Sequence, residues 1–263
     1  MDNIFVTRVI ISFLVAGILI ASATLIAEKA GSKIGGLIAN LPSNILVSFV
    51  FLAIVQDTSF IIDVIPAIPI GMTIDTLFVF MFVVFLRFGV VLSTILSLSA
   101  WFALALVAVS FSSGHLICNV AFYIVVTLSA FLILEKIVKV RSVPQTAKTY
   151  TKTQIVIRAI LSGSVVASVI VISRFFNPYV VGIFATFPAV LISTLVILAV
   201  NQSREFAQAT GKILVLSSSN IFVYALSVYF TYGGLGITLG TVISFACAFL
   251  WVWLFHPVVQ RLA

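Results

Sequence analysis

A single carboxylate stands near the middle of a long apolar stretch. Asp75 lies 12 residues before Arg87 in the apolar segment 66–86, so a helix there would place it about 18 Å from the helix end, near mid-bilayer. An ionised carboxylate at that depth costs at least ~2.5 kcal/mol, and such a residue is usually protonated, paired or turned toward water. Asp75 is therefore a candidate to bind a proton or cation. The alternative is a neutral carboxyl that hydrogen-bonds a neighbouring helix.

Amide and hydroxyl side chains gather beside two prolines and around Asn220. In a transporter, such groups line a pathway near the midplane, whereas in a sealed bundle they make hydrogen bonds between helices worth about 0.6 kcal/mol each. The residues expected along a solute or ion pathway are Asp75, Asn220, Asn40, Asn44, Ser43, Thr186 and Ser219.

The two prolines occupy equivalent places. Pro42 follows Gly36 by six residues, and Pro188 follows Gly182 by six. A proline removes one helical hydrogen bond and crowds the carbonyl four residues back, so each should kink its helix. Two kinked helices near opposite faces would serve as gates, although membrane helices also tolerate proline for structural reasons alone.

Several chemistries lack their motifs. The sequence has no glycine-rich phosphate loop, no His-Glu-x-x-His, no Gly-x-Ser-x-Gly and no pair of intramembrane aspartates. Cys118 and Cys247 lie in separate apolar runs, and His115 and His256 are expected at helix ends. We therefore expect no enzyme activity, no cofactor and no metal. The three tryptophans, Trp101, Trp251 and Trp253, are expected to be interfacial or lipid-facing.

The composition indicates a membrane protein. Hydrophobic residues make up 62% of the 263 and charged residues 8%, with a mean hydropathy of +1.32. A soluble domain carries about 25% charged residues. The net charge of +7 therefore indicates basic cytoplasmic loops and no nucleic-acid partner.

Apolar runs predict an all-α fold of about nine transmembrane helices, since open sheets do not survive in lipid. The expected spans are 9–27, 35–56, 66–86, 89–110, 115–134, 155–173, 179–201, 208–231 and 234–255. Pro66 and Pro69 lie at the start of the third span, and the sequence leaves open whether residues 59–65 form a short interfacial turn.

The chain carries an internal match at a shift of 146 residues. Gly17, Gly36 and Pro42 fall on Gly163, Gly182 and Pro188, and Gln56 falls on Gln202. After a one-residue slip, Asp75 falls on Asn220 and Gly89 on Gly234. The match predicts a first four-helix repeat at 1–112, an inverter helix with a basic loop at 113–153, and a second repeat at 154–263.

The basic residues predict the orientation. With the N-terminus outside and the C-terminus cytoplasmic, 12 of the 14 Lys and Arg residues face the cytoplasm, and only Arg8 and Arg174 do not. The second repeat then begins after five crossings, so it runs antiparallel to the first. The sequence thus predicts a multi-pass protein of the inner or plasma membrane with two inverted-topology repeats. Asp75 and Asn220 would face each other across the pseudo-two-fold axis.

The second half resembles the GlpM-like (YdgC-type) family of small bacterial inner-membrane proteins. The resemblance rests on NPYVVGIFATFPA (177–189), REFAQAT (204–210), SSNIFVYALSVYF (218–230) and FLWVWL (249–254), and more loosely on GGLIANLP (35–42) and TIDTLFVF (73–80). It implies a dual-topology ancestor that duplicated and fused around one inverter helix. A fused pseudo-dimer can act as a monomer, although higher oligomers are compatible with it.

Three functions fit these features. The first is a secondary transporter of a small solute, working by alternating access and coupled to a proton or cation through Asp75. The second is a narrow channel for a small ion. The third is a membrane scaffold or accessory subunit that transports nothing. Apart from the lipid bilayer, the expected partner is a small solute or ion.

Overall fold

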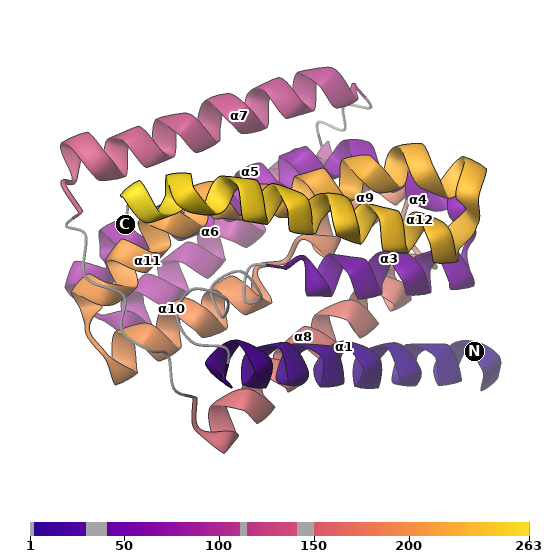
Figure 1. Cartoon of the computed structure of the whole chain (residues 1–263), viewed down its shortest axis with the longest axis horizontal. Coiled ribbons are helices and arrows are strands. Elements are labelled where there is room, and N and C mark those ends of the chain that lie inside the picture. The colour runs from indigo at the N-terminus through magenta and orange to yellow at the C-terminus, as the bar shows by residue number, and fades with distance from the viewer. Residues whose placement is uncertain (1–2, 30–40, 111–114, 141–149, 263) are drawn as a thin grey trace.

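The protein is a bundle of long helices. The computed structural model describes residues 3–29, 41–110, 115–140 and 150–262, and these ranges are helical without a strand. The longest helices run roughly along the long axis of the molecule (Figure 1). This is the all-α membrane fold that the composition predicts.

The first half of the chain forms helices of unequal length. They are α1 (Asn3–Lys29), α3 (Ser43–Val55), α4 (Thr58–Val64), the 3₁₀ turn η1 (Ile65–Ala67), α5 (Ile68–Phe85), the 3₁₀ turn η2 (Leu86–Phe88) and α6 (Val90–Ser110). Residues 59–65, for which the sequence left a short turn open, are helical, because α4 continues through η1 into α5. Asp57 caps α4 by accepting a hydrogen bond from the Phe60 amide, and Pro66 falls in the 3₁₀ turn, where its missing N–H is tolerated.

A linker helix and the second half follow. The linker helix α7 (Leu116–Leu132) ends in a π-helical turn, η3 (Ile133–Ile137). The second half contains α8 (Lys152–Ile172), α9 (Pro178–Ala185), α10 (Ala189–Asn201), α11 (Arg204–Ser217) and α12 (Ser219–Leu262). Within α12 the backbone leaves helical geometry at Gly236 (φ 71°, ψ 179°), so the predicted boundary at 234 is two residues too early.

Seven helical stretches of the described residues are long and apolar enough to cross a membrane, against nine predicted spans. The difference arises at two places. Arg204–Phe255 contains two predicted spans joined at Gly236. The predicted span 35–56 is described only from residue 41, where it contributes the 13-residue helix α3.

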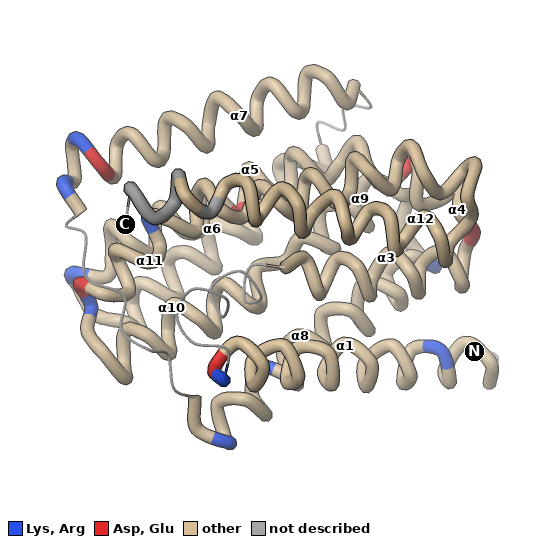
Figure 2. The backbone as a smooth tube through the Cα atoms, viewed as in Figure 1, with Lys and Arg blue, Asp and Glu red and all other residues tan. Residues whose placement is uncertain are grey.

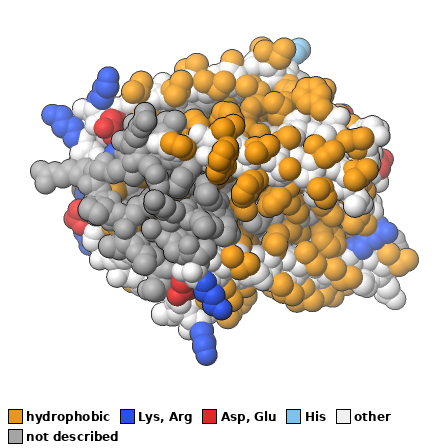
Figure 3. All heavy atoms as spheres, viewed as in Figure 1, with side chains coloured by type: hydrophobic (Ala, Val, Ile, Leu, Met, Phe, Trp, Pro, Cys, Tyr) orange, Lys and Arg blue, Asp and Glu red, His pale blue; other side chains and the backbone are white. Residues whose placement is uncertain are grey.

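The surface suits a membrane with one basic side. Hydrophobic side chains gather along the top and over the right-hand part of the visible face (Figure 3). Most Lys and Arg positions lie at the end where α10 ends and α11 begins, on the left of Figure 2. At the opposite end, Arg8 donates to the carbonyl of Ile54 at 3.1 Å, and the Arg174 guanidinium lies 3.7 Å from the centre of the Phe5 ring.

α1 and α8 pack against each other through two glycines. A Cβ atom on Gly17 would lie 3.2 Å from the carbonyl oxygen of Ala159, and one on Gly163 would lie 2.6 Å from that of Phe13. Small residues of this kind let membrane helices approach closely. The contacts join residue 13 to 163 and residue 17 to 159, so the two helices run antiparallel.

α3 and α10 begin and end in the same way. Each begins after a proline with nearly the same backbone angles: φ −79° and ψ 55° at Pro42, φ −80° and ψ 42° at Pro188. Each ends at a glutamine, with φ −100° and ψ −82° at Gln56 and φ −115° and ψ −86° at Gln202. The next helix then begins after an N-cap side chain, Asp57 for α4 and Ser203 for α11.

Candidate functional site

Asp75 is buried where α5 meets α6. Its side chain is 2% exposed, and its Oδ1 accepts a hydrogen bond from Nε1 of Trp101 at 2.7 Å. Trp101 is fully buried, so the prediction that it faces the interface or lipid is wrong. The indole contributes a buried polar N–H, and Asp75 is the acceptor that satisfies it. Trp251 and Trp253 are exposed.

Aromatic rings from the second half enclose this bond. The Trp101 ring packs edge-on against Phe184, with centroids 5.7 Å apart, and against Phe187 at 4.9 Å. Phe102 completes the cluster at 5.2 Å. Phe187 lies between α9 and α10, so a loop of the second half packs against the indole that bonds the carboxylate of the first. We call Asp75, Trp101, Thr186 and Phe187 the Asp75 site.

The helix around Pro188 is broken. α9 ends at Ala185, Phe187 donates to the Phe184 carbonyl at 3.1 Å, and α10 begins at Ala189 with Pro188 as its N-cap. Pro42 is likewise the N-cap of α3. Pro188 thus interrupts the span Pro178–Asn201 at the place where a kink was predicted, as the N-cap of α10 and not inside a continuous helix. With ψ near 50°, neither proline continues a helix on its N-terminal side.

Two close contacts hold the α9–α10 break against α5. A Cβ on Gly71 would collide with the side chain of Thr186, so Thr186 lies directly on α5 one turn before Asp75. A Cβ on Gly182 would lie 2.7 Å from the Val64 carbonyl oxygen and 2.7 Å from the Ala67 Cβ. Gly182 therefore lets α9 cross the α4–α5 connection closely, in addition to its predicted place beside a proline.

The polar residues at the start of α3 are buried or half-buried. Ser43 donates to the Leu41 carbonyl at 3.4 Å. Asn44 Oδ1 and Ser48 Oγ are buried without a hydrogen-bond partner among the described residues. Asn40 and Gly36 lie outside the described residues.

Asn220 and Ser219 lie at the start of α12. Asn220 is buried, and Ser219 accepts a hydrogen bond from Nε1 of Trp251 at 3.0 Å. α5 and α12 are in contact, but the Asp75 carboxylate turns to α6. That Asp75 and Asn220 face each other across an axis stays a prediction.

The linker helix α7 is bonded to both halves. Asn119 donates to the Pro66 carbonyl at 2.8 Å, and the hydroxyls of Thr127 and Thr76 lie 3.3 Å apart. At the other end of α7, Glu135 pairs with Lys212 of α11. Thr76 follows Asp75 directly, so α7 contacts the helix turn that carries the candidate acid.

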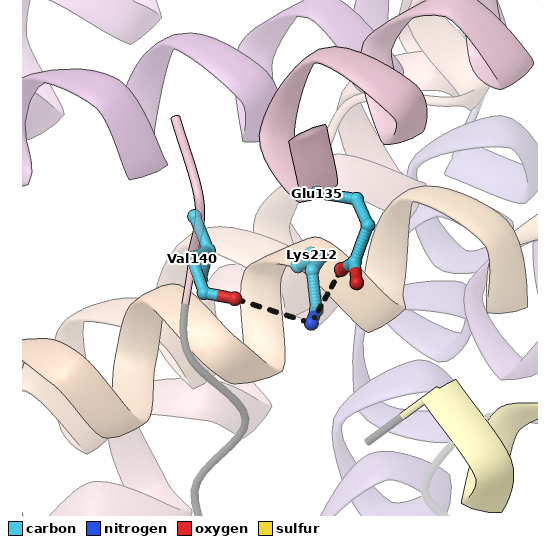
Figure 4. A network of polar contacts seen from close by, with 3 residues as sticks. All are labelled: Glu135, Val140 and Lys212. Atoms are coloured by element: carbon cyan, nitrogen blue, oxygen red, sulfur yellow. Dashed lines mark hydrogen bonds and ion pairs between the residues drawn. The ribbon is translucent and has the colours of Figure 1, made fainter. Parts of the chain in front are cut away.

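Figure 4 shows the Glu135 contact. Lys212 Nζ lies 2.9 Å from Glu135 Oε2 and 3.3 Å from the Val140 carbonyl oxygen. The Lys212 side chain is 1% exposed and that of Glu135 44%. A buried ammonium needs such partners, because an unpaired charge away from water is costly. Glu135, in the π-helical turn η3, satisfies this cation.

Two buried cations were missed by the sequence interpretation. Lys212 and Arg158 were counted with the basic residues of cytoplasmic loops, but both lie inside helices and are buried. A signal was present: Arg158 falls within the predicted span 155–173 and Lys212 within 208–231. An ionisable residue inside a span is a functional candidate by default.

In the part of the chain that the structure describes, no three His, Cys, Asp or Glu side chains gather as metal ligands would. Cys118 and Cys247 are free thiols.

Residues 9–115 match a known family model. The family is described as a protein of unknown function (DUF3147). No curated protein and no solved structure matches the chain. The match covers less than half of the chain, and it contains Asp75 and Trp101. It lies in the half where the GlpM-like resemblance is looser, and the comparisons give that resemblance no support.

Proposed function

We propose that the chain is a secondary transporter of a small solute, and not an enzyme, in which Asp75 binds and releases a proton or cation. The single observation that carries the proposal is the contact between the Asp75–Trp101 pair and the α9–α10 break. Broken helices near the midplane, one in each of two inverted halves, are the places where transporters hold ligands. Here such a break packs against the tryptophan that bonds the buried carboxylate of the other half.

Inverted halves are part of this proposal. The antiparallel packing of α1 on α8 through Gly17 and Gly163 supports it, since these glycines are 146 residues apart and make mirrored contacts. The shared backbone angles at Pro42 and Pro188 support it further. The gathering of Lys and Arg at one end favours an outside N-terminus and a cytoplasmic C-terminus (Figure 2).

The structure is closed at Asp75. Because the carboxylate and Trp101 are both buried, ion exchange requires Phe187 to move away from Trp101. The break provides such freedom, since α9 and α10 can change their angle without breaking an interior helical bond. The same burial favours the second candidate, a sealed scaffold that transports nothing.

Flux through the purified protein separates the two candidates. Proteoliposomes containing a pH-sensitive dye would be exposed to gradients of carboxylates, amino acids, sugars, K⁺ or Na⁺ at two external pH values. We expect saturable, solute-dependent proton movement that Asp75→Asn abolishes. Asp63→Asn is the matched control, because Asp63 lies exposed on α4 of the same helical stretch. Full activity of Asp75→Asn would reject the coupling role, and absence of all flux would favour the scaffold.

A further inference from the structure

Arg158 is a buried guanidinium with one hydrogen bond. It lies on α8 six residues after Lys152, about 9 Å from the start of that helix at the basic end of the bundle. Arg158 is 5% exposed, and its Nη1 donates to Oγ1 of Thr194 on α10 at 2.8 Å. The guanidinium carbon lies 5.2 Å from the centre of the Tyr150 ring. Nε is buried and has no hydrogen-bond partner among the described residues.

No described carboxylate forms an ion pair with Arg158. A guanidinium stays charged in proteins, and a buried charge is ordinarily paired. The chain has seven Asp and Glu residues, and outside the described residues there is only Asp2. Of the rest, Asp75 bonds Trp101, Glu135 bonds Lys212, Asp57 and Asp63 lie at α4, and Glu205 lies in the first turn of α11. Glu28, at the end of α1, is near enough to act electrostatically on Tyr150, but it forms no ion pair with Arg158. Arg158 has a hydroxyl and an aromatic face but no counter-ion from these groups.

Helix packing does not require this charge. The positions 146 residues earlier are Ser12 and Ser48, on α1 and α3, which pack together as α8 and α10 do. There the Ser12 hydroxyl bonds its own helix at Val9, and no cation is buried. The same helix contact thus forms with two small neutral side chains. The arginine in the second half therefore has a role beyond joining two helices.

We infer that Arg158, Thr194 and Tyr150 bind a small oxyanion, a carboxylate or phosphate group, at the basic end of the bundle. With Nη1 given to Thr194, the Nε–Nη2 edge of the guanidinium remains, and this edge matches two oxygens of a carboxylate or phosphate. The inference goes beyond the proposed function, because oxyanion binding at this site holds whether the protein transports a solute or is a sealed scaffold.

The two neighbours fit the same ligand. Thr194 accepts from Arg158 through its oxygen, so its own hydroxyl proton is left to donate. The Tyr150 ring covers the guanidinium, and burial raises the pKa of the Tyr150 phenol, so it stays a neutral donor at neutral pH. The oxyanion has two sources at a membrane surface: a soluble anion or the headgroup of an anionic lipid.

Thermal unfolding of the full chain in a neutral detergent tests the site. The probes are sodium phosphate, sulfate and succinate against chloride at equal ionic strength, and separately phosphatidylglycerol against phosphatidylcholine in mixed micelles. We expect a rise in Tm of roughly 5 °C at about 100 times Kd. A response to the soluble salts identifies a soluble anion, and a response to phosphatidylglycerol alone identifies a lipid headgroup. Absence of any response overturns the inference.

Variants separate binding from a purely structural role. Arg158→Gln should abolish the shift and, without anion, be at least as stable as the parent, because it removes an uncompensated buried charge. Thr194→Val should raise Kd about tenfold, and Arg158→Lys should bind more weakly because it lacks the fork. Arg174→Gln, at an exposed arginine of the opposite end, should behave as the parent. An unchanged shift in Arg158→Gln, or in both Thr194→Val and Arg158→Lys, contradicts the site.

Discussion

The two halves of the chain share a backbone pattern and differ in buried charge. α3 and α10 begin at prolines and end at glutamines with nearly the same angles. At their contacts with α1 and α8, however, the first half has Ser12 and Ser48 where the second has Arg158 and Thr194. A helix arrangement that tolerates either set is not specified by those side chains. The replacement of two serines by Arg158 and Thr194 therefore indicates a chemical role for these side chains and not a requirement of the fold.

The first half in turn holds the buried acid. Asp75 bonds the buried Trp101, whereas the comparable tryptophan bond of the second half joins Trp251 to the hydroxyl of Ser219. The described interior thus has a carboxylate in one half and the cations Arg158 and Lys212 in the other. The buried charges of the two halves therefore differ in sign, although the backbone pattern is shared.

The largest expected effect concerns the ion pair between α7 and the second half, whose two partners are buried to very different degrees. Glu135→Gln leaves the buried Lys212 ammonium without its carboxylate, and we expect a loss of about 3 kcal/mol in unfolding free energy, the lower end for breaking a buried pair because Glu135 is half exposed. Lys212→Met leaves only a carboxylate that water can reach and should cost less than about 1 kcal/mol. Equal losses in denaturant unfolding would show that the two partners are equally buried.

The two tryptophan bonds should differ next. Trp101→Phe removes the donor from buried Asp75, and we expect a loss of about 2 kcal/mol, since a buried acceptor without a partner costs 1–3 kcal/mol. Trp251→Phe, at an exposed bond, should cost no more than about 0.5 kcal/mol. Thermal unfolding measures both. Adding Asp75→Asn to Trp101→Phe should recover part of the loss, and a purely additive double variant would argue against the bond.

The glycines at the α1–α8 contact should differ by less. Gly163→Ala places a methyl group 2.6 Å from the Phe13 carbonyl oxygen and should cost about 1–2 kcal/mol through overpacking. Gly17→Ala meets the Ala159 carbonyl oxygen at 3.2 Å, so a small shift relieves it and the expected change is below about 0.5 kcal/mol. Unfolding in a detergent series is the measurement. Equal effects would mean that the helices are symmetric at this crossing.

The smallest expected effect is a difference in pH dependence between the helix that Asp57 caps and the helix that Ser203 caps. The hydrogen bond from the Phe60 amide lowers the pKa of the Asp57 carboxylate below its ordinary value of 3.8. Because the folded pKa is lowered, the cap stabilises α4 above the unfolded pKa and is lost as pH falls through the folded value. Hydrogen exchange at residues 58–61 should therefore become faster, relative to the intrinsic rate, between about pH 5 and about pH 3. Residues 204–207, capped by a serine, should not change, and Asp57→Asn should remove the difference.

Much of the fold follows from the pattern of apolar runs. The helices lie where those runs predict them, and the prolines mark real interruptions. The sequence did not show whether each proline kinks a helix or begins a new one. That depends on the backbone angle ψ of the proline, which is 55° at Pro42 and 42° at Pro188. The helical path of 59–65 could not be decided from the sequence, since Pro66 and Pro69 hide the continuity that the Asp57 cap and a 3₁₀ turn provide.

The site was predictable in part. The depth of Asp75 in its span indicated a buried acid, and burial is what the structure shows. Its partner was not predictable, because Trp101 lies 26 residues away and a tryptophan in a membrane protein is often interfacial. The partners of Arg158 and Lys212 lie 36 and 77 residues away, so only the tertiary fold reveals that these cations are buried.

The linker helix α7 restricts how the halves can rearrange. Asn119 and Glu135 fasten it to α4–α5 and to α11 at points 16 residues apart, about 24 Å of nearly inextensible rod. A rocking of one half against the other changes the distance between those points, so one fastening must detach or the rod must change length. Glu135 itself lies in the π-helical turn Ile133–Ile137, which has more residues per turn than an α-helix and can tighten to ordinary α geometry. Such rewinding would change the length of α7 in a discrete step and so allow two alternative arrangements of the halves.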